Sequence, residues 1–321
     1  MRRRNFLLIP LIASVAAVRS AAQAAWPVRV CRFVVPFAAG SALDIPARMI
    51  AQRLGSEWGI SFVVENRTGA GGWNGAQAVV QAPADGSTLL FTSASVSILP
   101  VLQPKLGFDP RKDLLPISLV CDVASVLLVR AASRFTSLPQ LMADARSAPG
   151  RITYGSGGTG SSNHLAGALF ASMAGIELLH VPYRGTAQSL NALYAGEIDL
   201  IFAPTLDVLG HVQQGDVRPL ATTLPDRLPA MATVPAIAEF VPGYDLSNWF
   251  AIFAPARFPE DLRARLVQAL TSLRDWPDLQ ARLAAGAALM RLDGPDPLAK
   301  RLADEISRWT RLVAKLGIKT E

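Results

Sequence analysis

Apolar runs and amphipathic stretches alternate along most of the chain. Residues 30–36 form an apolar run, as expected of a parallel strand buried on both faces, and residues 42–58 have the spacing of an amphipathic helix. A strand at 61–67, a loop at 68–72, a short alanine-rich helix and a strand at 87–95 follow. This order of strands and helices predicts an α/β lobe with a doubly wound sheet.

A second β-α-β unit lies in the middle of the chain. It reads as a strand at 151–154, a glycine-serine turn at 155–162, a helix at 163–174 and a strand at 177–182. A further helix and the strand EIDLIF follow. Two such lobes imply a cleft between them, because ligands of open α/β sheets bind beyond the carboxyl ends of the strands.

The chain is predicted to cross between the lobes twice. The strand-rich passage LLPISLVCDVASVLLV leads from the first lobe to the second, and the return is predicted near 217–223. A strand and three helices then complete the first lobe, and the last helix, at 296–316, has an apolar stripe typical of core packing. The predicted division is a leader at 1–24, lobe 1 at 25–121 plus 224–321, and lobe 2 at 122–223.

The first amphipathic helix has two candidate start signals. Ser41-x-x-Asp44 resembles a capping box, but that start places Pro46 where a backbone hydrogen bond is due. With Asp44 as the N-cap, Pro46 falls in the first turn, where proline loses nothing. We therefore predict that Asp44 caps this helix.

The N-terminus has the pattern of a secretory signal peptide. A basic start precedes an apolar run at 6–18 and the small-x-small end Ala22-Gln23-Ala24. The run is shorter than the ~20 residues that span a bilayer, so the mature protein is predicted to be soluble in the periplasm, exported by the Sec or the twin-arginine route. Removing the leader lowers the formal net charge from +6 to +2, since it holds four arginines and no acid, and the remaining charge gives no footprint for nucleic acid.

The cysteines and histidines do not form a metal motif. Cys31 and Cys121 each lie in an apolar strand-like run, which favours buried free thiols, while a disulfide stays open in an oxidising compartment. His164, His180 and His211 are scattered, and no short Cys/His spacing occurs. No metal site is predicted.

The glycine-serine turn is the strongest candidate for ligand chemistry. It carries four glycines and no acidic side chain, so its backbone N–H groups and the dipole of the following helix favour an anion. The turn also matches G-x-G-x-x-G, but the next strand ends at Tyr183-Arg184 and not at the acid that holds a ribose. We predict an anion seat without a dinucleotide cofactor, with Tyr183 and Arg184 lining the cleft.

The serines of this turn do not indicate a hydrolase. Ser156, Ser161 and Ser162 lie near His164 in the sequence, but no G-x-S-x-G elbow is present. A histidine at the start of the same helix reaches back poorly to activate them. Helix capping explains these serines better, and the protein is predicted not to be an enzyme.

Six segments together carry a family resemblance. VVPFAAGSALDIPAR, VVENRTGAGG, YGSGGTGSSNHLAGALF, HVPYRG, EIDLIF and NWFAIFAP resemble, in this order and at these distances, the Bug family of periplasmic solute-binding receptors of tripartite tricarboxylate transporters. The resemblance covers essentially the whole mature chain. It implies a two-lobed, Venus-flytrap protein that has no cofactor and closes, as a monomer, on a small carboxylate. Its partners would be membrane permease subunits or, alternatively, a sensor protein.

The resemblance also implies which residues form the cleft. The family builds it from the turns after the first and third strands, the glycine-serine turn, the loop after HVP and the position after EIDLIF. The residues here are Phe37, Ala39, Gly40, Ser41, Asp44, Ser93, Ser95, Gly158, Thr159, Gly160, Ser161, Ser162, His164, Tyr183, Arg184 and Ala203. Ala203 replaces a frequent aspartate, which argues against a ligand with an ammonium group. Helix N-termini after Ser41 and Ser161 suit a di- or tricarboxylate.

Overall fold

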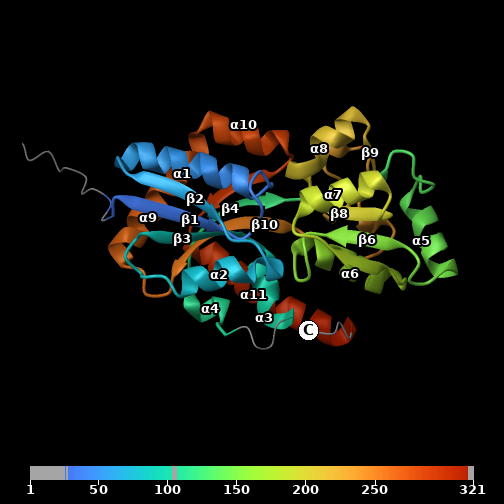
Figure 1. The fold of residues 1–321 in the computed structure, drawn as a ribbon, viewed down its shortest axis with the longest axis horizontal. Coiled ribbons are helices and arrows are strands. Elements are labelled where there is room, and N and C mark those ends of the chain that lie inside the picture. Colours follow the sequence, from blue (N-terminus) through green and yellow to red (C-terminus); the bar gives the residue numbers. More distant parts are fainter. Residues whose placement is uncertain (1–25, 27, 103–106, 317–321) are drawn as a thin grey trace, which may run out of the picture.

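The computed structural model describes residues 26, 28–102 and 107–316, and these form two lobes that lie side by side (Figure 1). The predicted leader at 1–24 lies outside the described residues. Each lobe is built on a mixed sheet with helices on both faces, which confirms the predicted α/β fold. No helix in the described ranges has both the length and the apolar composition needed to cross a bilayer.

The first lobe contains a six-stranded sheet. Its strands are, in order across the sheet, β11 (Leu289–Asp293), β4 (Leu114–Val123), β10 (Asn248–Pro255), β3 (Thr88–Ser93), β1 (Val30–Val35) and β2 (Ser61–Asn66). Alternate residues of β1 face opposite sides, because Phe33 and Val35 join one buried cluster and Val34 joins the other. Strand β10 runs antiparallel to both of its neighbours.

Helices cover both faces of this sheet. One face carries α1 (Asp44–Trp58), α9 (Glu260–Ser272) and α10 (Pro277–Ala285), whose leucines and alanines pack into the first cluster. The other face carries α2 (Trp73–Val80), α3 (Ser95–Leu102) and α11 (Pro295–Leu316), with the short α4 (Pro110–Asp113) nearby. The predicted polar turn at 108–113 therefore contains a helical turn, which begins at the proline after the N-cap Asp109.

The second lobe contains a five-stranded sheet. Its strands are, in order across the sheet, β7 (Leu179–Pro182), β6 (Thr153–Ser156), β8 (Leu200–Pro204), β5 (Ser125–Arg130) and β9 (Val217–Thr222). Helices α5 (Leu138–Ser147) and α6 (Ser162–Ala174) cover one face, and α7 (Thr186–Ala195) and α8 (Thr205–Gln214) cover the other. The β-α-β unit predicted at 151–182 is present as β6, α6 and β7.

The chain passes between the lobes where the predicted strand-rich passage lies. Strand β4 belongs to the first sheet and β5 to the second, and only Ala124 separates them. On the return, packing on the second lobe continues beyond residue 223, since Leu228 and Met231 join one of its clusters and Tyr244 and Leu246 join the other. We therefore propose that lobe 2 extends to residue 246.

Helix α11 links the lobes a third time. Leu298, Leu302 and Ile306 pack on the first sheet, whereas Trp309 joins the core of the second lobe. These four residues belong to the predicted apolar stripe, and the side chain of Leu316 lies outside the described residues. Figure 1 shows this helix running beneath both lobes.

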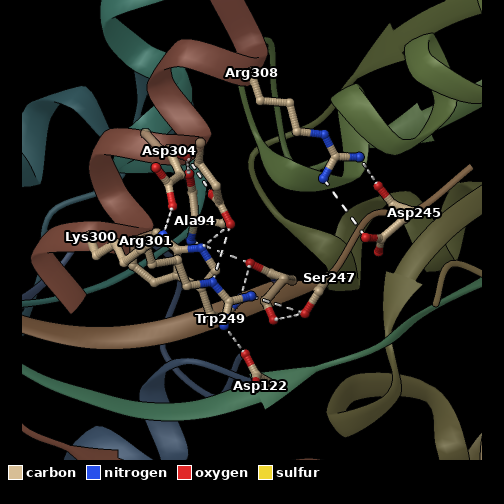
Figure 2. A network of polar contacts seen from close by, with 12 residues as sticks. Ala94, Asp122, Asp245, Ser247, Trp249, Lys300, Arg301, Asp304 and Arg308 are labelled. Carbon is tan, nitrogen blue, oxygen red and sulfur yellow. Dashed lines mark hydrogen bonds and ion pairs between the residues drawn. The ribbon is translucent and has the colours of Figure 1, made fainter. Parts of the chain in front are cut away.

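Arg301 of α11 forms hydrogen bonds to both segments in which the chain crosses between the lobes. Its guanidinium donates to the carboxylate of Asp122 near the end of β4 and, at 3.2 Å, to the Ser247 hydroxyl just before β10 (Figure 2). One turn further along, Glu305 accepts hydrogen bonds from Trp249 Nε1 at 2.8 Å and from the Ser97 hydroxyl at 2.9 Å. The network joins α11 to the two segments that connect the lobes.

The cysteines are free and buried. Cys31 lies on β1 and Cys121 on β4, and two strands, β3 and β10, lie between them in the sheet. Three strand spacings of about 4.8 Å place the two chains roughly 14 Å apart. A disulfide needs Cα atoms within ~7 Å of each other, so these thiols do not pair in this fold.

Candidate ligand-binding cleft

A cleft opens where the strands of both sheets end. It has about 440 Å³ of space between its walls, part of which is open to solvent. The carboxyl ends of β1, β3, β6 and β8 reach it, as doubly wound sheets require. The antiparallel β10 contributes its first residue, Asn248, at the same edge.

Only part of the predicted site lines this cleft. The predicted lining residues found there are Phe37, Ser41, Ser93, Ser161 and Ser162. Sequence analysis missed eleven others, namely Ala38, Ala42, Leu43, Gly157, Asn163, Gly185, Thr186, Pro204, Asp207, Asn248 and Phe250. Most of these are neighbours of predicted residues, but Asp207, Asn248 and Phe250 come from elements that carried no site signal in the sequence.

The N-terminus of α6 presents free donors to the cleft. Ser161 caps this helix, because its hydroxyl accepts the His164 N–H at 3.3 Å and its carbonyl accepts the Leu165 N–H at 3.1 Å. No hydrogen bond between described residues engages the N–H groups of Ser162 and Asn163, and both residues line the cleft. The partial positive charge of the helix end adds to these donors.

Asn163 is a polar group without a full set of partners. The residue is 4% exposed, and its Oδ1 has no hydrogen-bond partner among the described residues. Its Nδ2 makes one long contact, 3.4 Å, to the Thr186 hydroxyl oxygen. A buried polar atom left unsatisfied costs roughly 1–3 kcal/mol, so this atom is poised to accept a hydrogen bond from a ligand.

Three further helices start at the cleft. The turn before α1 contributes Ser41 to Leu43, the start of α7 contributes Gly185 and Thr186, and the start of α8 contributes Pro204 and Asp207. All four helices, α6 included, therefore direct their positive ends toward one space. Sequence analysis expected two such ends.

Asp207 places a carboxylate among these helix ends. Its Oδ1 accepts the Ala42 N–H at 2.5 Å, across the cleft from the first lobe. Burial raises the pKa of Asp207 to about 6, although the Thr186 side chain and the Ala42 N–H act in the opposite direction. The protein thus supplies one anion to its own anion-binding cleft.

The predicted cap Asp44 has a different role. The residue is the first of α1 and not its N-cap, which is Leu43, so the cap prediction was wrong. Its carboxylate accepts hydrogen bonds from the Gly40 N–H, Arg48 Nε and Asn66 Nδ2 at 2.7–2.8 Å. Burial raises the pKa of Asp44, but these three donors outweigh it and hold the pKa below its ordinary value. Asp44 fixes the turn that shapes the cleft and does not line it.

The glycine-serine turn is stabilised from within. The Gly158 N–H donates to the Ser156 hydroxyl at 3.1 Å, and the Gly160 N–H donates to His164 Nδ1 at 3.2 Å. Burial lowers the pKa of His164 to about 4, so the ring is neutral and can accept this bond. The N–H groups of Gly158 and Gly160 are therefore already engaged, and the free donors described above lie at the start of α6, at the predicted Ser162 and at Asn163.

The other predicted residues lie away from the cleft wall. Ser95 is buried behind Ser93, whose hydroxyl donates to it at 3.1 Å, and Ala203 is fully buried in the core of the second lobe. Tyr183 is partly buried at the end of β7. The exposed residues are Ala39, Gly40, Thr159 and Arg184.

The Ser156 hydroxyl contacts a histidine, but a different one from the predicted neighbour. Ser156 Oγ lies 2.6 Å from His180 Nε2, and the His180 ring lies 4.1 Å from the ring of His164. Burial, together with His164, lowers the pKa of His180 to about 3. Neither Ser156 nor His180 lines the cleft. Among the described residues, no group of three or more His, Cys, Asp or Glu side chains could hold a metal ion.

Comparisons with known proteins agree with this architecture. The sequence pattern of the family described as "Tripartite tricarboxylate transporter family receptor" matches residues 46–318. The chain belongs to this family. Among curated relatives of this receptor, an "UPF0065 protein in tcbD-tcbE intergenic region" from a Pseudomonas species is 34% identical over 98% of this chain and 94% of its own. "Protein BugT" from Bordetella pertussis is 32% identical over 92% of this chain and 91% of its own.

Solved structures of related receptors superpose closely. The periplasmic binding protein BugD is 29% identical, with a TM-score of 0.87 over 92% of this chain and 100% of its own. A protein from R. palustris with adipate is 32% identical, with a TM-score of 0.86 over 92% of this chain and 99% of its own. MatC from Rhodopseudomonas palustris with bound malate is 30% identical, with a TM-score of 0.85 over 89% of this chain and 99% of its own. The family is therefore one of solute-binding receptors, and these two members bind small carboxylates.

Proposed function

We propose that this receptor captures a small carboxylate in the periplasm and delivers it to the permease subunits of a tripartite tricarboxylate transporter, without catalysing a reaction. The observation that carries the proposal is the start of α6, where the N–H groups of Ser162 and Asn163 face the cleft with no partner. Adipate and malate in two relatives support the carboxylate class. The signal-peptide pattern predicted at 1–24 supports the location, and the family description favours transport over sensing.

The geometry favours binding by backbone amides over binding by an arginine. Arg184 is exposed and does not line the cleft, so the carboxylate would meet no side-chain cation there. Charge would instead be balanced by the partial positive charges of the converging helix ends, each worth about 0.3–1 kcal/mol, or somewhat more in a partly buried site. Phe37, Leu43 and Phe250 supply the apolar wall for the carbon chain.

A thermal-shift screen tests the proposal. The mature protein is heated with a panel of mono-, di- and tricarboxylates, amino acids, aromatic acids and uncharged sugars, and a small carboxylate is expected to raise the melting temperature. At 100 times Kd, a ligand stabilises the folded state by about 2.7 kcal/mol. Stabilisation by sugars alone would contradict the proposal.

The substitution Ser162→Asp tests the proposed carboxylate site at the start of α6. An aspartate in the first turn of α6 suits the helix dipole, so the fold should be retained, but its charge lies where the carboxylate must bind. Binding should fall at least tenfold. Ser137→Asp is the matched control, because Ser137 is the exposed N-cap of α5 and lies outside the cleft.

A further inference from the structure

Asp207 of the second lobe binds the first-lobe N–H group that a second ligand carboxylate would need. The turn before α1 offers the Ala42 N–H to the cleft, and the Asp207 carboxylate from the opposite lobe accepts it at 2.5 Å. Asp207 lies in the first turn of α8, where the helix dipole stabilises its negative charge. The N-terminal end of α1, which would otherwise favour a ligand anion, is therefore already paired with the Asp207 carboxylate.

Thr186 lies between Asp207 and the proposed carboxylate site at the start of α6. Asn163, whose N–H belongs to this site, contacts the Thr186 hydroxyl through Nδ2 at 3.4 Å. Thr186 also lines the cleft beside Asp207, and its side chain acts to lower the pKa of that carboxylate. One side chain, that of Thr186, thus lies between the two, and a solute bound at α6 extends toward a group that accepts hydrogen bonds and repels anions.

We propose that Asp207 determines the specificity of the cleft: it selects a solute with a single carboxylate, held at α6, whose other end donates a hydrogen bond, as a hydroxyl or ammonium group does. This inference rests on the proposed function. The sequence predicted a diacid, because two helix N-termini were expected at the cleft. That prediction did not include Asp207, which already binds at one of these helix ends. It also restores the ammonium group as an acceptable end, since Asp207 supplies the acid that Ala203 does not.

Isothermal titration with three probes of equal length tests the inference. Succinate, 4-hydroxybutyrate and 4-aminobutyrate share a four-carbon chain with one terminal carboxylate and differ at the other end. We expect the wild-type protein to bind 4-hydroxybutyrate or 4-aminobutyrate at least tenfold more tightly than succinate. In Asp207→Asn, which keeps an oxygen for the Ala42 N–H but loses the charge, the ratio should shift by at least tenfold toward succinate.

The control is Asp216→Asn, which removes the same charge from an exposed residue just after α8 and should leave the ratio unchanged. Tighter binding of succinate by the wild-type protein, or an unchanged ratio in Asp207→Asn, would overturn the inference. If other carboxylates of the screen bind and none of these three does, the inference fails and the proposed function stands. If no carboxylate binds, both fail.

Discussion

The Asp207 carboxylate of the second lobe accepts a 2.5 Å hydrogen bond from the Ala42 N–H of the first lobe. A direct hydrogen bond across the cleft requires the two lobes to touch there, and we interpret this arrangement as a closed form. The lobes also meet at Gly71, where an added Cβ would lie 2.5 Å from the Thr159 carbonyl oxygen. Closure brings the helix ends of both lobes around one space, and this is the state that would hold a solute.

Gly71→Ala should prevent closure. Its new methyl group would press on the backbone of Thr159 and Gly160 in the opposite lobe, so the closed form loses its contact. We expect ligand affinity to fall at least tenfold. Small-angle scattering should show that saturating ligand reduces the radius of gyration of the wild-type protein but not that of the variant.

Gly59→Ala is the matched control for this variant. Gly59 has φ +66 and Gly71 has φ +63, so alanine carries a similar strain of roughly 1–2 kcal/mol at both positions. A Cβ at Gly59 meets no atom within 4 Å. The control should lose stability and keep its affinity. Equal affinity losses in both variants would contradict closure by contact at Gly71.

Arg301→Met should destabilise the junction between the lobes. Arg301 pairs with Asp122, whose side chain is only 9% exposed, so the substitution leaves a mostly buried carboxylate with Arg291 as its remaining partner (Figure 2). Breaking such a pair costs about 3–5 kcal/mol when no partner remains, and we expect about 2–3 kcal/mol here. Urea unfolding measures the change.

Lys300→Met, one residue earlier on α11, serves as the control. Lys300 pairs with Asp304 at 2.5 Å, but its side chain is 79% exposed, so the pair contributes no more than about 1 kcal/mol. If the two variants lose the same free energy of unfolding, the network behind the crossings does not stabilise the junction.

The paired histidines should make the protein less stable in acid. Burial lowers the pKa of His164 to about 4 and, with His164 nearby, that of His180 to about 3, from an ordinary 6.5. Between pH 6.5 and 4 the unfolded chain binds more protons than the folded one, so the free energy of unfolding falls as pH falls. Each group contributes about 1.4 kcal/mol per pH unit in that window.

His164→Asn tests this origin of the acid sensitivity. Asparagine keeps an acceptor near the Gly160 N–H but does not titrate, so stability should fall less steeply from pH 7 to pH 4 than in the wild-type protein. The variant also removes the contribution of His164 to the lowered pKa of His180, which makes the fall in stability still less steep. Parallel curves for wild type and His164→Asn would contradict the assignment.

Local patterns predicted the elements of the fold well where the signal was strong. The unit β6-α6-β7 and the cap at Ser161 follow from an apolar strand, a glycine-rich turn and a serine before a helix. Sequence analysis assigned no element to α3, α5, α8, β9 or β11. Helix α3 contains Pro100, and α8 starts after Pro204 with no side-chain cap, so neither carries the usual start signal.

The site was predicted less well because its chemistry depends on long-range partners. Asp44 resembles a ligand-binding acid in the sequence, but Arg48 and Asn66 use its oxygens, and Asn66 is 22 residues away. Conversely, Asp207 reaches the cleft only because α8 faces the turn of Ala42, 165 residues earlier. Spacing along the chain does not reveal such pairs.

The central claim is that the free amides of α6 hold the solute's carboxylate. The most direct measurement is a crystal structure of the mature protein with the best carboxylate from the screen. The account predicts carboxylate oxygens about 2.7–3.2 Å from the backbone nitrogens of Ser162 and Asn163, with the other end of the solute toward Asp207. A carboxylate bound instead by Arg184 outside the cleft, with these two amides unengaged, would contradict it.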